Sequence, residues 1–306
     1  MIIIARNTYE GWIPEEYDSN ALVTVRTVSA INQLAKRVPM GSDTKKVARA
    51  GGYDPEVILK GGTYPEGVNL NDTVILDAVK IGKAVRIAEE DIDDSFIDIL
   101  NTTKAEYARS HGVFLDNAAL AVSGIPNGGT IPFKSVYRSV TTADASTGYV
   151  ANANLITTAG ALTYDKLSAL FGLRESGNFS GNDVVIAHPA FKSLLRGIKD
   201  TTGAPLFVAN PRLGEADTLF GYPLVWSQGA KVSAVATANP TGNALLVVAN
   251  SDFLLLGDRT PFETKFSDPR TGVATLSDEA VLQFRQRVAF TVGNPNAVAV
   301  LEITVI

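Results

Sequence analysis

The longest helical pattern in the chain runs from about Ile92 to Val122, where hydrophobic positions recur at steps of three and four residues. The members of this stripe are Phe96, Leu100, Thr103, Tyr107, Phe114, Ala118 and Val122. Acidic residues between Glu89 and Asp94 favour the positive end of a helix dipole, and Gly124 and Pro126 close the other end. A helix of about 25 residues spans roughly 40 Å. The pattern therefore predicts an uninterrupted rod across an elongated domain.

A strand pattern with a turn-rich centre precedes the helix, from Asp43 to Ile87. Its central stretch, RAGGYDPEVILKGGTYPEGVNLND, is rich in glycine and contains prolines, which excludes a helix there. The return limb alternates, with Lys80 and Arg86 on one face and hydrophobic residues on the other: Ile75, Val79, Ile81, Val85 and Ile87. We predict a long β-hairpin whose limbs, at ten to fifteen residues each, would reach roughly 30 to 50 Å. Such a hairpin is either an active-site flap or an arm that lies on a neighbour.

The residues before and after these elements are less regular. Residues 1–42 mix helical and strand spacing, which fits either an arm that needs a partner surface or a strand and helix docked on their own domain. Residues 123–154 show no strong period and predict exposed loops at a domain boundary. A helix is expected over Leu162–Glu175 with its N-cap near Thr163, a buried strand over Asn182–Ala187, and a second helix after Pro189. With the short strand LVWS, this order predicts a compact α/β subdomain.

Strand patterns dominate the end of the chain. Ala244–Asp258 predicts two short strands around Asn250, and Leu282–Val292 alternates between hydrophobic and polar positions. A turn at Gly293-Asn294-Pro295-Asn296 leads into a final strand, Ala297–Ile306. We expect these strands to form one sheet that packs on the long helix. The α/β subdomain would then be an insertion between helix and sheet.

Composition narrows the classes of function. The 306 residues are 45% hydrophobic and 19% charged with a net charge of -5, and no large Lys/Arg cluster occurs, which disfavours phosphate-backbone binding as the main activity. The absence of cysteine excludes disulfides, thiolate metal sites and cysteine nucleophiles. The N-terminal hydrophobic run is too short for a signal peptide, and no run approaches the roughly 18 to 20 residues that span a bilayer. We therefore expect a protein made and used in a cytoplasm, or released from one by lysis.

Candidate chemistry is sparse. His188 precedes a predicted helix without an acidic or nucleophilic partner at short spacing, so a capping or packing role is favoured, and the same holds for His111. The acidic run lacks calcium-loop spacing, and the glycine pairs do not form a phosphate loop. We expect no catalytic, cofactor-binding or metal-binding residue. Lys60, at the hairpin tip, is either a solvated loop lysine or a group that reaches a neighbouring subunit, as a salt bridge or an isopeptide with an Asn side chain.

Seven segments in this order resemble one known family. They are RVPMGSDTKKVARA, DAVKIGKAVRIAEEDIDDS, HGVFLDNAALAVSGIPNG, DVVIAHPAFKSLLRGIKDTTGAPLF, TLFGYPLVWSQ, VVANSDFLLLGDR and LQFRQRVAFTVGNPNAVAVL, and together they cover roughly residues 38–301. The order of parts is similar to that of the major capsid proteins of tailed bacteriophages, a fold also resembled by encapsulins and by the floor of herpesvirus shells. None of the segments is a catalytic motif, so the likeness rests on their order.

The resemblance implies an α+β fold with an N-terminal arm at 1–42 and an extended loop, the hairpin, at 43–88. It places a peripheral domain, with the long spine helix and a β-sheet, at 89–125 and 256–306. An α/β axial domain would be inserted at 126–255. The implied protein is no enzyme and needs no cofactor. It assembles as hexamers and pentamers into the icosahedral head of a tailed phage, in the cytoplasm of the bacterial host, and it belongs to the virion.

Partners also follow from the resemblance: further copies of the chain, a portal protein, packaged double-stranded DNA contacted non-specifically, and in some heads a decoration protein, with no membrane. Because Met1 lies immediately before the arm, a separate scaffold protein is expected, or none. The candidates for contact between subunits are Trp12, Tyr53, Lys60, Tyr64, Glu66, Arg285 and Arg287. Some members of the family link a loop lysine to an asparagine in the terminal sheet, but TLSDEAVLQFRQR contains no asparagine. We therefore expect a non-covalent shell.

Two alternatives remain open. An encapsulin shell around an enzyme cargo has the same fold, although the opening MIIIARNTYEGWIPEEY does not resemble the cargo-docking helix with which encapsulins tend to start. A hydrolase would use the glycine-rich hairpin as a flap over its active site. That enzyme would be a monomer or small oligomer with a polar pocket, whereas a shell protein forms capsomers or particles.

Overall fold

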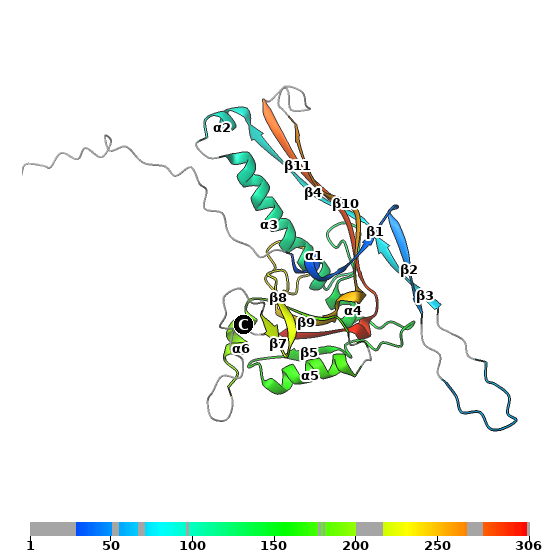
Figure 1. Cartoon of the computed structure of the whole chain (residues 1–306). Helices are drawn as coiled ribbons and strands as arrows, with labels where there is room; N and C mark the ends of the chain where they lie inside the picture. The colour runs from blue at the N-terminus through cyan, green and yellow to red at the C-terminus, as the bar shows by residue number, and fades with distance from the viewer. Residues whose placement is uncertain are drawn as a thin grey trace, which may run out of the picture.

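The computed structural model describes residues 29–50, 55–66, 71–95, 98–176, 179, 181–199, 217–267 and 278–304. Three sheets organise them: four strands in the order β1-β10-β11-β4, six in the order β5-β12-β9-β6-β8-β7, and the isolated pair β2-β3 (Figure 1). The helices are α1 Ala30–Leu34, α2 Glu89–Asp93, α3 Ile99–Leu120, α4 Val136–Thr141, α5 Tyr164–Glu175 and α6 Phe191–Arg196. The first strands are β1 Lys36–Pro39, β2 Thr44–Ala50, β3 Asn71–Asp77, β4 Val79–Ala88, β5 Leu155–Thr158 and β6 Asp183–Ala187. The others are β7 Thr218–Leu219, β8 Tyr222–Trp226, β9 Ala244–Asn250, β10 Leu254–Ser267, β11 Glu279–Val292 and β12 Val298–Ile303.

The long helix is shorter than its sequence pattern suggests. The acidic run forms its own helix, α2, which ends at the C-cap Asp94. A new helix, α3, begins after Asp98, whose side chain accepts a hydrogen bond from the backbone N–H of Asn101. The prediction of one rod from Ile92 to Val122 is therefore wrong, because a second N-cap restarts the helix. With 22 residues, α3 spans about 33 Å.

The four-stranded sheet packs on α3, as predicted. The ring of Tyr107 stacks on Phe284 of β11 with ring centroids 4.1 Å apart. One turn further along, His111 Nε2 and Gln286 Oε1 are hydrogen-bonded at 2.6 Å. Leu282 and Phe284 of β11 are buried while Gln283 between them is exposed, as the alternation in the sequence predicts. From Val288 to Val292 every residue is buried, so the alternation does not extend to the end of the strand.

The predicted hairpin divides into two parts. Among the described strands, β2 pairs with β3 alone, in limbs of seven residues. β4 continues the return limb but pairs with β11 inside the body. The buried face switches at Ala78 between the two strands: Leu76 is fully buried and Ile75 is 54% exposed, whereas Val79 and Ile81 pack against the core. The prediction of continuous limbs of ten to fifteen residues is therefore wrong. The predicted alternation of hydrophobic and polar positions also does not continue from β3 into β4.

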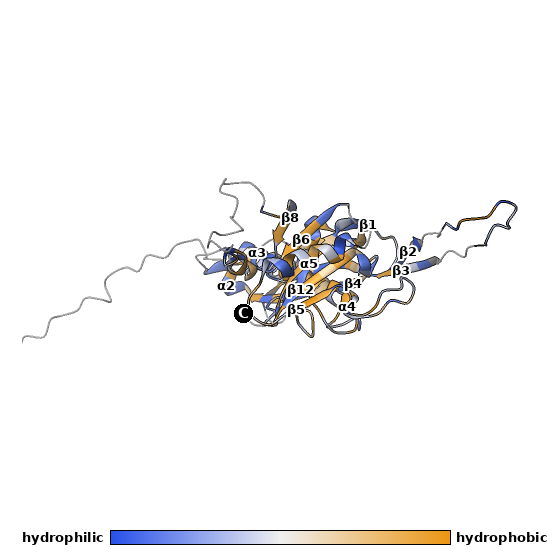
Figure 2. Cartoon of the chain, turned by 90° about the horizontal axis from the view of Figure 1, so that it is seen from below, coloured by the Kyte–Doolittle hydropathy of each residue, from blue (hydrophilic) through white to orange (hydrophobic). Residues whose placement is uncertain are grey.

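The six-stranded sheet carries the second core. All residues of β6, β9 and β12 are buried, as expected for strands with neighbours on both sides. β12 lies between β5 and β9 in this sheet, whereas β10 and β11 lie in the four-stranded sheet. The expectation that all the strands after Ala244 form one sheet is therefore wrong. The loop-like stretch 123–154 also contains a helix that the sequence analysis missed, α4, capped by Ser135. In Figure 2 hydrophobic strand residues gather within the body, and the hairpin extends away from it.

The described part of the N-terminal region is docked on its own domain. α1 begins at the N-cap Ser29, and β1 runs parallel to β10, with Lys36 opposite Leu255 and Pro39 opposite Asp258. For residues 29–42 the structure thus agrees with a strand and helix docked on their own domain, rather than with an arm that needs a partner surface. Residues 1–28, with Trp12, lie outside the described residues, as does Tyr53.

Candidate functional site

The hairpin tip exposes hydrophobic side chains far from either core. In residues 55–66, Val57 is 97% exposed, Leu59 82% and Tyr64 81%. The chain reverses at Leu59–Gly62, where the N–H of Gly62 donates to the Leu59 carbonyl oxygen at 2.8 Å and Gly61 has a φ of 84°. Figures 1 and 2 both show the tip pointing away from the body. Residues 55–66 line neither the hollow beside His188 nor the one beside Arg37, whereas the flap hypothesis requires the tip to cover a pocket.

The structure separates the predicted contact residues into two groups. Lys60, Tyr64 and Glu66 lie exposed on the tip. Arg285 and Arg287 lie on β11 and pair within the chain. Arg285 donates from Nε and Nη2 to Glu263 Oε2, at 2.9 and 2.7 Å.

Arg49 fastens the root of the hairpin to the body. Its Nη1 donates to Asp144 Oδ2 and to the Gly293 carbonyl oxygen, each at 3.0 Å, and its Nη2 donates to Ser146 Oγ at 2.7 Å. Nη2 also pairs with Asp72 of β3. We call these five residues the Arg49 clasp. It joins both hairpin strands to two loops of the body.

The surroundings of the two clasp aspartates lower the pKa of both carboxyls. Hydrogen bonds from Ser146, from the backbone of Thr73 and from Arg49 lower the pKa of the Asp72 carboxyl. For Asp144, burial opposes ionisation, but hydrogen bonds from Ser146 and Arg49 outweigh it and lower the pKa. The clasp is thus a charged network, which sequence analysis missed because its members are far apart in the chain.

A small apolar cluster and a second charged contact complete the root. Met40, Leu76, Leu255 and Ala289 form a separate buried cluster. Asp43, which precedes β2, pairs with Arg259 and lies 3.7 Å from Arg287 Nη1. The predicted contact residue Arg287 therefore helps to anchor the hairpin of its own chain.

Asp116 joins three distant parts of the chain. Its buried carboxylate accepts hydrogen bonds from Ser29 Oγ at 2.6 Å, from the N–H groups of Ala30 and Ile31 at 2.8 and 3.1 Å, and from Ser227 Oγ. Burial raises the pKa of the Asp116 carboxyl, and the four donors act in the opposite direction. The carboxylate thus ties the start of α1 and the loop after β8 to α3.

The adjacent Asn117 and Gly229 fit the same junction together. Asn117 Nδ2 donates to the carbonyl oxygens of Gly229 and Lys231 at 3.0 and 2.9 Å. A Cβ on Gly229 would lie 2.6 Å from the backbone nitrogen of Asn117 and 2.7 Å from Asp116 Cβ. Only glycine lets this loop approach α3 so closely. A carboxylate and an amide in an apolar helix were a signal that sequence reasoning could have used.

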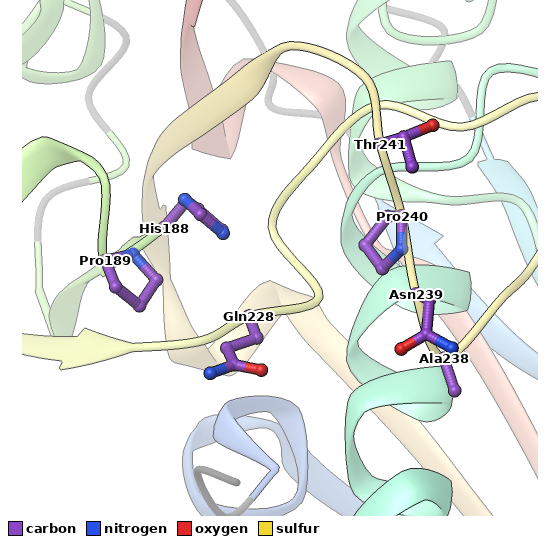
Figure 3. A pocket seen from close by; sticks show the side chains of 7 residues that line it. All are labelled: His188, Pro189, Gln228, Ala238, Asn239, Pro240 and Thr241. Atoms are coloured by element: carbon purple, nitrogen blue, oxygen red, sulfur yellow. The ribbon is translucent and has the colours of Figure 1, made fainter. Parts of the chain in front are cut away.

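His188 borders a shallow hollow at the ends of the parallel strands β6 and β8 (Figure 3). Its Nδ1 accepts a hydrogen bond from the N–H of Ala190 at 3.1 Å, but Ala190 itself is the N-cap of α6 and no side chain caps that helix. Burial, and then the charge of Lys231, lower the pKa of His188 to about 4. The lining contains no carboxylate: it consists of His188, Pro189, Gln228, Ala238, Asn239, Pro240 and Thr241. Over the described ranges, no group of three or more His, Asp or Glu side chains is placed to hold a metal.

His111 is a packing residue as well. It is hydrogen-bonded to Gln286 and stacks on Tyr107 with ring centroids 5.9 Å apart. Burial lowers the pKa of His111, and the hydrogen bond with Gln286 opposes that effect. Within the described part of the chain, no helix is long and apolar enough to cross a membrane.

Comparisons with known proteins give a consistent result. A family model described as "Phage capsid family" matches residues 11–303. The "Probable major capsid protein gp17" of Mycobacterium phage L5 is 24% identical over 205 residues, a match that covers 65% of this chain and 59% of that protein. The aligned part thus spans less than two thirds of the relative's length.

Solved structures share the fold over nearly the whole chain. A chain from Microbacterium phage Oxtober96 superposes with a TM-score of 0.72 at 19% identity, covering 97% of both chains. A chain from the "Capsid of native GTA particle computed with C5 symmetry" gives a TM-score of 0.72 at 14% identity, covering 96% of both chains. At these identities the likeness establishes the α+β architecture alone, which agrees with the fold class expected from the sequence.

Proposed function

The chain belongs to the phage capsid family, and we propose that it is the major capsid protein of a tailed bacteriophage, which assembles as hexamers and pentamers into the icosahedral head around the DNA genome. The curated relative is described as a probable major capsid protein, and one structural neighbour comes from the capsid of a GTA particle, which supports a role in a shell built from many copies. Closed symmetry of this kind converts one chain into a finite shell.

The observation that carries the proposal is the exposed hairpin tip. Full burial of a large hydrophobic side chain is worth about 1.5 to 3 kcal/mol. Val57, Leu59 and Tyr64 are almost fully exposed and far from the cores of their own chain. Three such side chains represent roughly 5 to 9 kcal/mol per copy that the described residues of the chain do not supply and that contact with another copy would. Because the root is fastened by the Arg49 clasp, the tip is presented outward rather than folded back.

We assign the parts of the chain accordingly. Residues 43–88 form the extended loop, residues 89–125 and 256–306 the peripheral domain, and residues 126–255 the axial domain, with β12 as a strand that the peripheral segment contributes to the axial sheet. On the tip, Lys60, Tyr64 and Glu66 are contact residues. Arg285 and Arg287 pair with acidic residues of their own chain, Glu263 and Asp43. Both face outward on the sheet, where they also contact a neighbouring copy.

The partners of the assembled head follow from the same proposal. A portal protein occupies one vertex, a separate scaffold protein guides assembly, and some heads add a decoration protein. Packaged DNA touches the inner surface without sequence preference, for which the modest net charge of -5 is no obstacle. The protein resides in the virion after assembly in the host cytoplasm. Its role is structural rather than enzymatic.

The encapsulin-type compartment is the second candidate, since it shares the fold. The phage and capsid names of the relatives favour the phage head. The content of purified particles separates the two functions. DNA-filled heads in infected cells identify the phage capsid, whereas particles that co-purify with one enzyme cargo identify the compartment.

The assembly assay uses the full chain expressed in bacteria, with and without its neighbouring gene products. Size-exclusion chromatography and electron microscopy are expected to reveal capsomers or shells. A variant with Val57→Ser, Leu59→Ser and Tyr64→Ser should stay folded but lose assembly. Val150→Ser, at a position 69% exposed on the body, is the matched control and should assemble normally. A wild-type chain that remains a monomer under all conditions would contradict the proposal.

A further inference from the structure

Asn127 and Gly128 form the one Asn-Gly dipeptide among the 306 residues. They lie in the loop between α3 and α4, and both are exposed. The backbone nitrogen that follows an asparagine is placed to attack the carbonyl carbon of that side chain within the same chain. Glycine leaves this nitrogen most accessible because it has no Cβ. Around Gly128 the loop is open, since an added Cβ would meet nothing within 4 Å.

The nitrogen of Gly128 is also not engaged elsewhere. Among the described residues, its N–H donates to no acceptor. Asn152 is exposed as well, but the N–H of the following Ala153 donates to the Val150 carbonyl oxygen at 3.2 Å. Attack at Asn152 would first have to break that hydrogen bond. Asn152 is therefore an internal control for exposure without a free nucleophile.

Two backbone N–H groups hold the side-chain oxygen of Asn127. Oδ1 accepts hydrogen bonds from Gly129 at 2.9 Å and from Ile131 at 3.0 Å. Because an N–H group can only donate, these contacts place the oxygen, rather than the nitrogen, of the amide on this side. Attack on Cγ moves negative charge onto Oδ1, and donors at these distances stabilise such an oxyanion. The loop thus polarises the amide for attack.

The departing group has a partner too. Asn127 Nδ2 donates to Thr130 Oγ1 at 3.2 Å, so a hydroxyl lies beside the nitrogen that must leave with an extra proton. The nucleophile, the oxyanion donors and the partner of the leaving group therefore meet within five consecutive residues, 127–131.

We propose that Asn127 is a site of self-catalysed deamidation. The Gly128 nitrogen bonds to Cγ of Asn127 and gives its proton to water, the Cγ–Nδ2 bond breaks, and ammonia leaves behind a five-membered succinimide ring. Water then opens the ring at the former side-chain carbonyl to give aspartate, or at the backbone carbonyl to give isoaspartate. The whole reaction consumes two molecules, the chain and one water, releases ammonia and oxidises nothing. It goes beyond the proposed shell function and does not depend on it.

The two products change the loop differently. Aspartate keeps an oxygen acceptor at the same place and adds one negative charge to each copy. Isoaspartate adds a methylene group to the main chain between residues 127 and 128. There the loop is closed by the Asn127 N–H, which donates to the Ile131 carbonyl oxygen at 3.0 Å, and is docked by the Ala236 N–H, which donates to the Thr130 carbonyl oxygen at 3.0 Å. We expect isoaspartate to loosen this docking.

The test follows the folded, unassembled full chain in mildly alkaline buffer. Peptide mapping by mass spectrometry measures the conversion of amide to carboxylate, and labelling with a protein isoaspartyl methyltransferase measures isoaspartate. A synthetic peptide of residues 120–134 is the unfolded reference. Asn127 should convert roughly tenfold faster in the folded chain than in the peptide, a smaller factor than for a buried oxyanion hole because water reaches the loop. Asn152 should keep its amide.

Two substitutions at one position isolate the oxyanion donors. Gly129→Pro removes the N–H that donates to Oδ1, whereas Gly129→Ala keeps it and adds a Cβ at an ordinary contact distance of 3.6 Å from Oδ1. Gly129→Pro should lose most of the acceleration, and Gly129→Ala should convert at the wild-type rate.

A folded chain that converts no faster than the peptide would overturn the proposal, because the loop would then protect the amide. Equal rates for Gly129→Pro and Gly129→Ala would overturn the role of the donors. Circular dichroism verifies that both variants fold. Should Gly129→Pro fail to fold, the comparison of the wild-type chain with the peptide decides alone.

Discussion

Arg49 Nη1 and Asp144 Oδ2 lie 3.0 Å apart although 95 residues separate them in the chain. This pair connects the projecting hairpin with the loop after α4, and the same guanidinium also reaches Asp72 and the carbonyl of Gly293. The hairpin is therefore fastened at its root while its tip is free for another molecule.

Replacing Arg49 should weaken the body as well as the hairpin. Arg49→Ala leaves Asp72 and Asp144 without their cation, and removing one member of a partly buried pair should cost about 2 to 3 kcal/mol of unfolding free energy. Urea unfolding of the unassembled chain measures this cost. Arg86→Ala, which breaks an exposed pair with Glu279, should cost no more than about 0.5 kcal/mol. Equal losses of unfolding free energy for the two variants would show that the Arg49 clasp stabilises the chain no more than an exposed ion pair does.

Gly229 tests the junction between α3 and the loop after β8. Gly229→Ala places a methyl group against the backbone of Asn117, and the resulting shift should destabilise the chain by about 1 to 3 kcal/mol. Gly172→Ala in α5 meets nothing within 4 Å and should stabilise it by roughly 0.5 to 1 kcal/mol. Thermal unfolding of both variants gives the comparison. A neutral Gly229→Ala would mean that the loop does not approach α3 as described.

His188 predicts a loss of stability in mild acid. Its pKa is lowered to about 4 in the folded chain, so the neutral ring is favoured by folding. This stability is present above the ordinary pKa of about 6.5 and is lost as the pH falls toward 4. His111 adds to the effect in the same direction. His188→Gln should show a smaller decrease in unfolding free energy between pH 6.5 and 4 than the wild type, and an identical decrease would contradict the account.

Lys60 should remain chemically unlinked. The start of β11 offers no asparagine to a neighbour's lysine, so particles dissolved in denaturant should release a single species of 32.4 kDa. Mass spectrometry of whole chains and of peptides around residue 60 measures this. Lys60→Arg, which cannot form the isopeptide, should give the same pattern. A peptide that joins Lys60 to another chain would disprove the non-covalent shell.

Elements governed by local sequence were predictable. The Thr163 N-cap begins α5 as expected, and the buried strands β6 and β9 follow from their continuous hydrophobic runs. Asp98 restarts a helix inside one periodic pattern, which periodicity alone does not reveal. At Ala78 the return limb stops pairing with β2 and begins to pair with β11. This change of partner depends on residues more than a hundred positions away in the chain.

The candidate site was predictable only in part. Glycine and proline marked the hairpin tip as a turn-rich projecting element, and the structure leaves Lys60, Tyr64 and Glu66 exposed there. Their role as contact residues stays a prediction. The Arg49 clasp was not visible in the sequence, and of the Asp116 junction only the polar pair Asp116 and Asn117 was, because the partners of each lie in distant segments. Their charges resemble ordinary surface charges until the fold brings the partners together.

The most direct test of the central claim is the reactivity of a single cysteine at position 57. In the free chain Val57 is 97% exposed, so a Val57→Cys thiol should react rapidly with a maleimide. We predict strong protection of this thiol in assembled particles, while a Val150→Cys thiol on the body reports general access. Equal labelling of Val57→Cys in free chains and in particles would contradict the claim that another copy covers the hairpin tip.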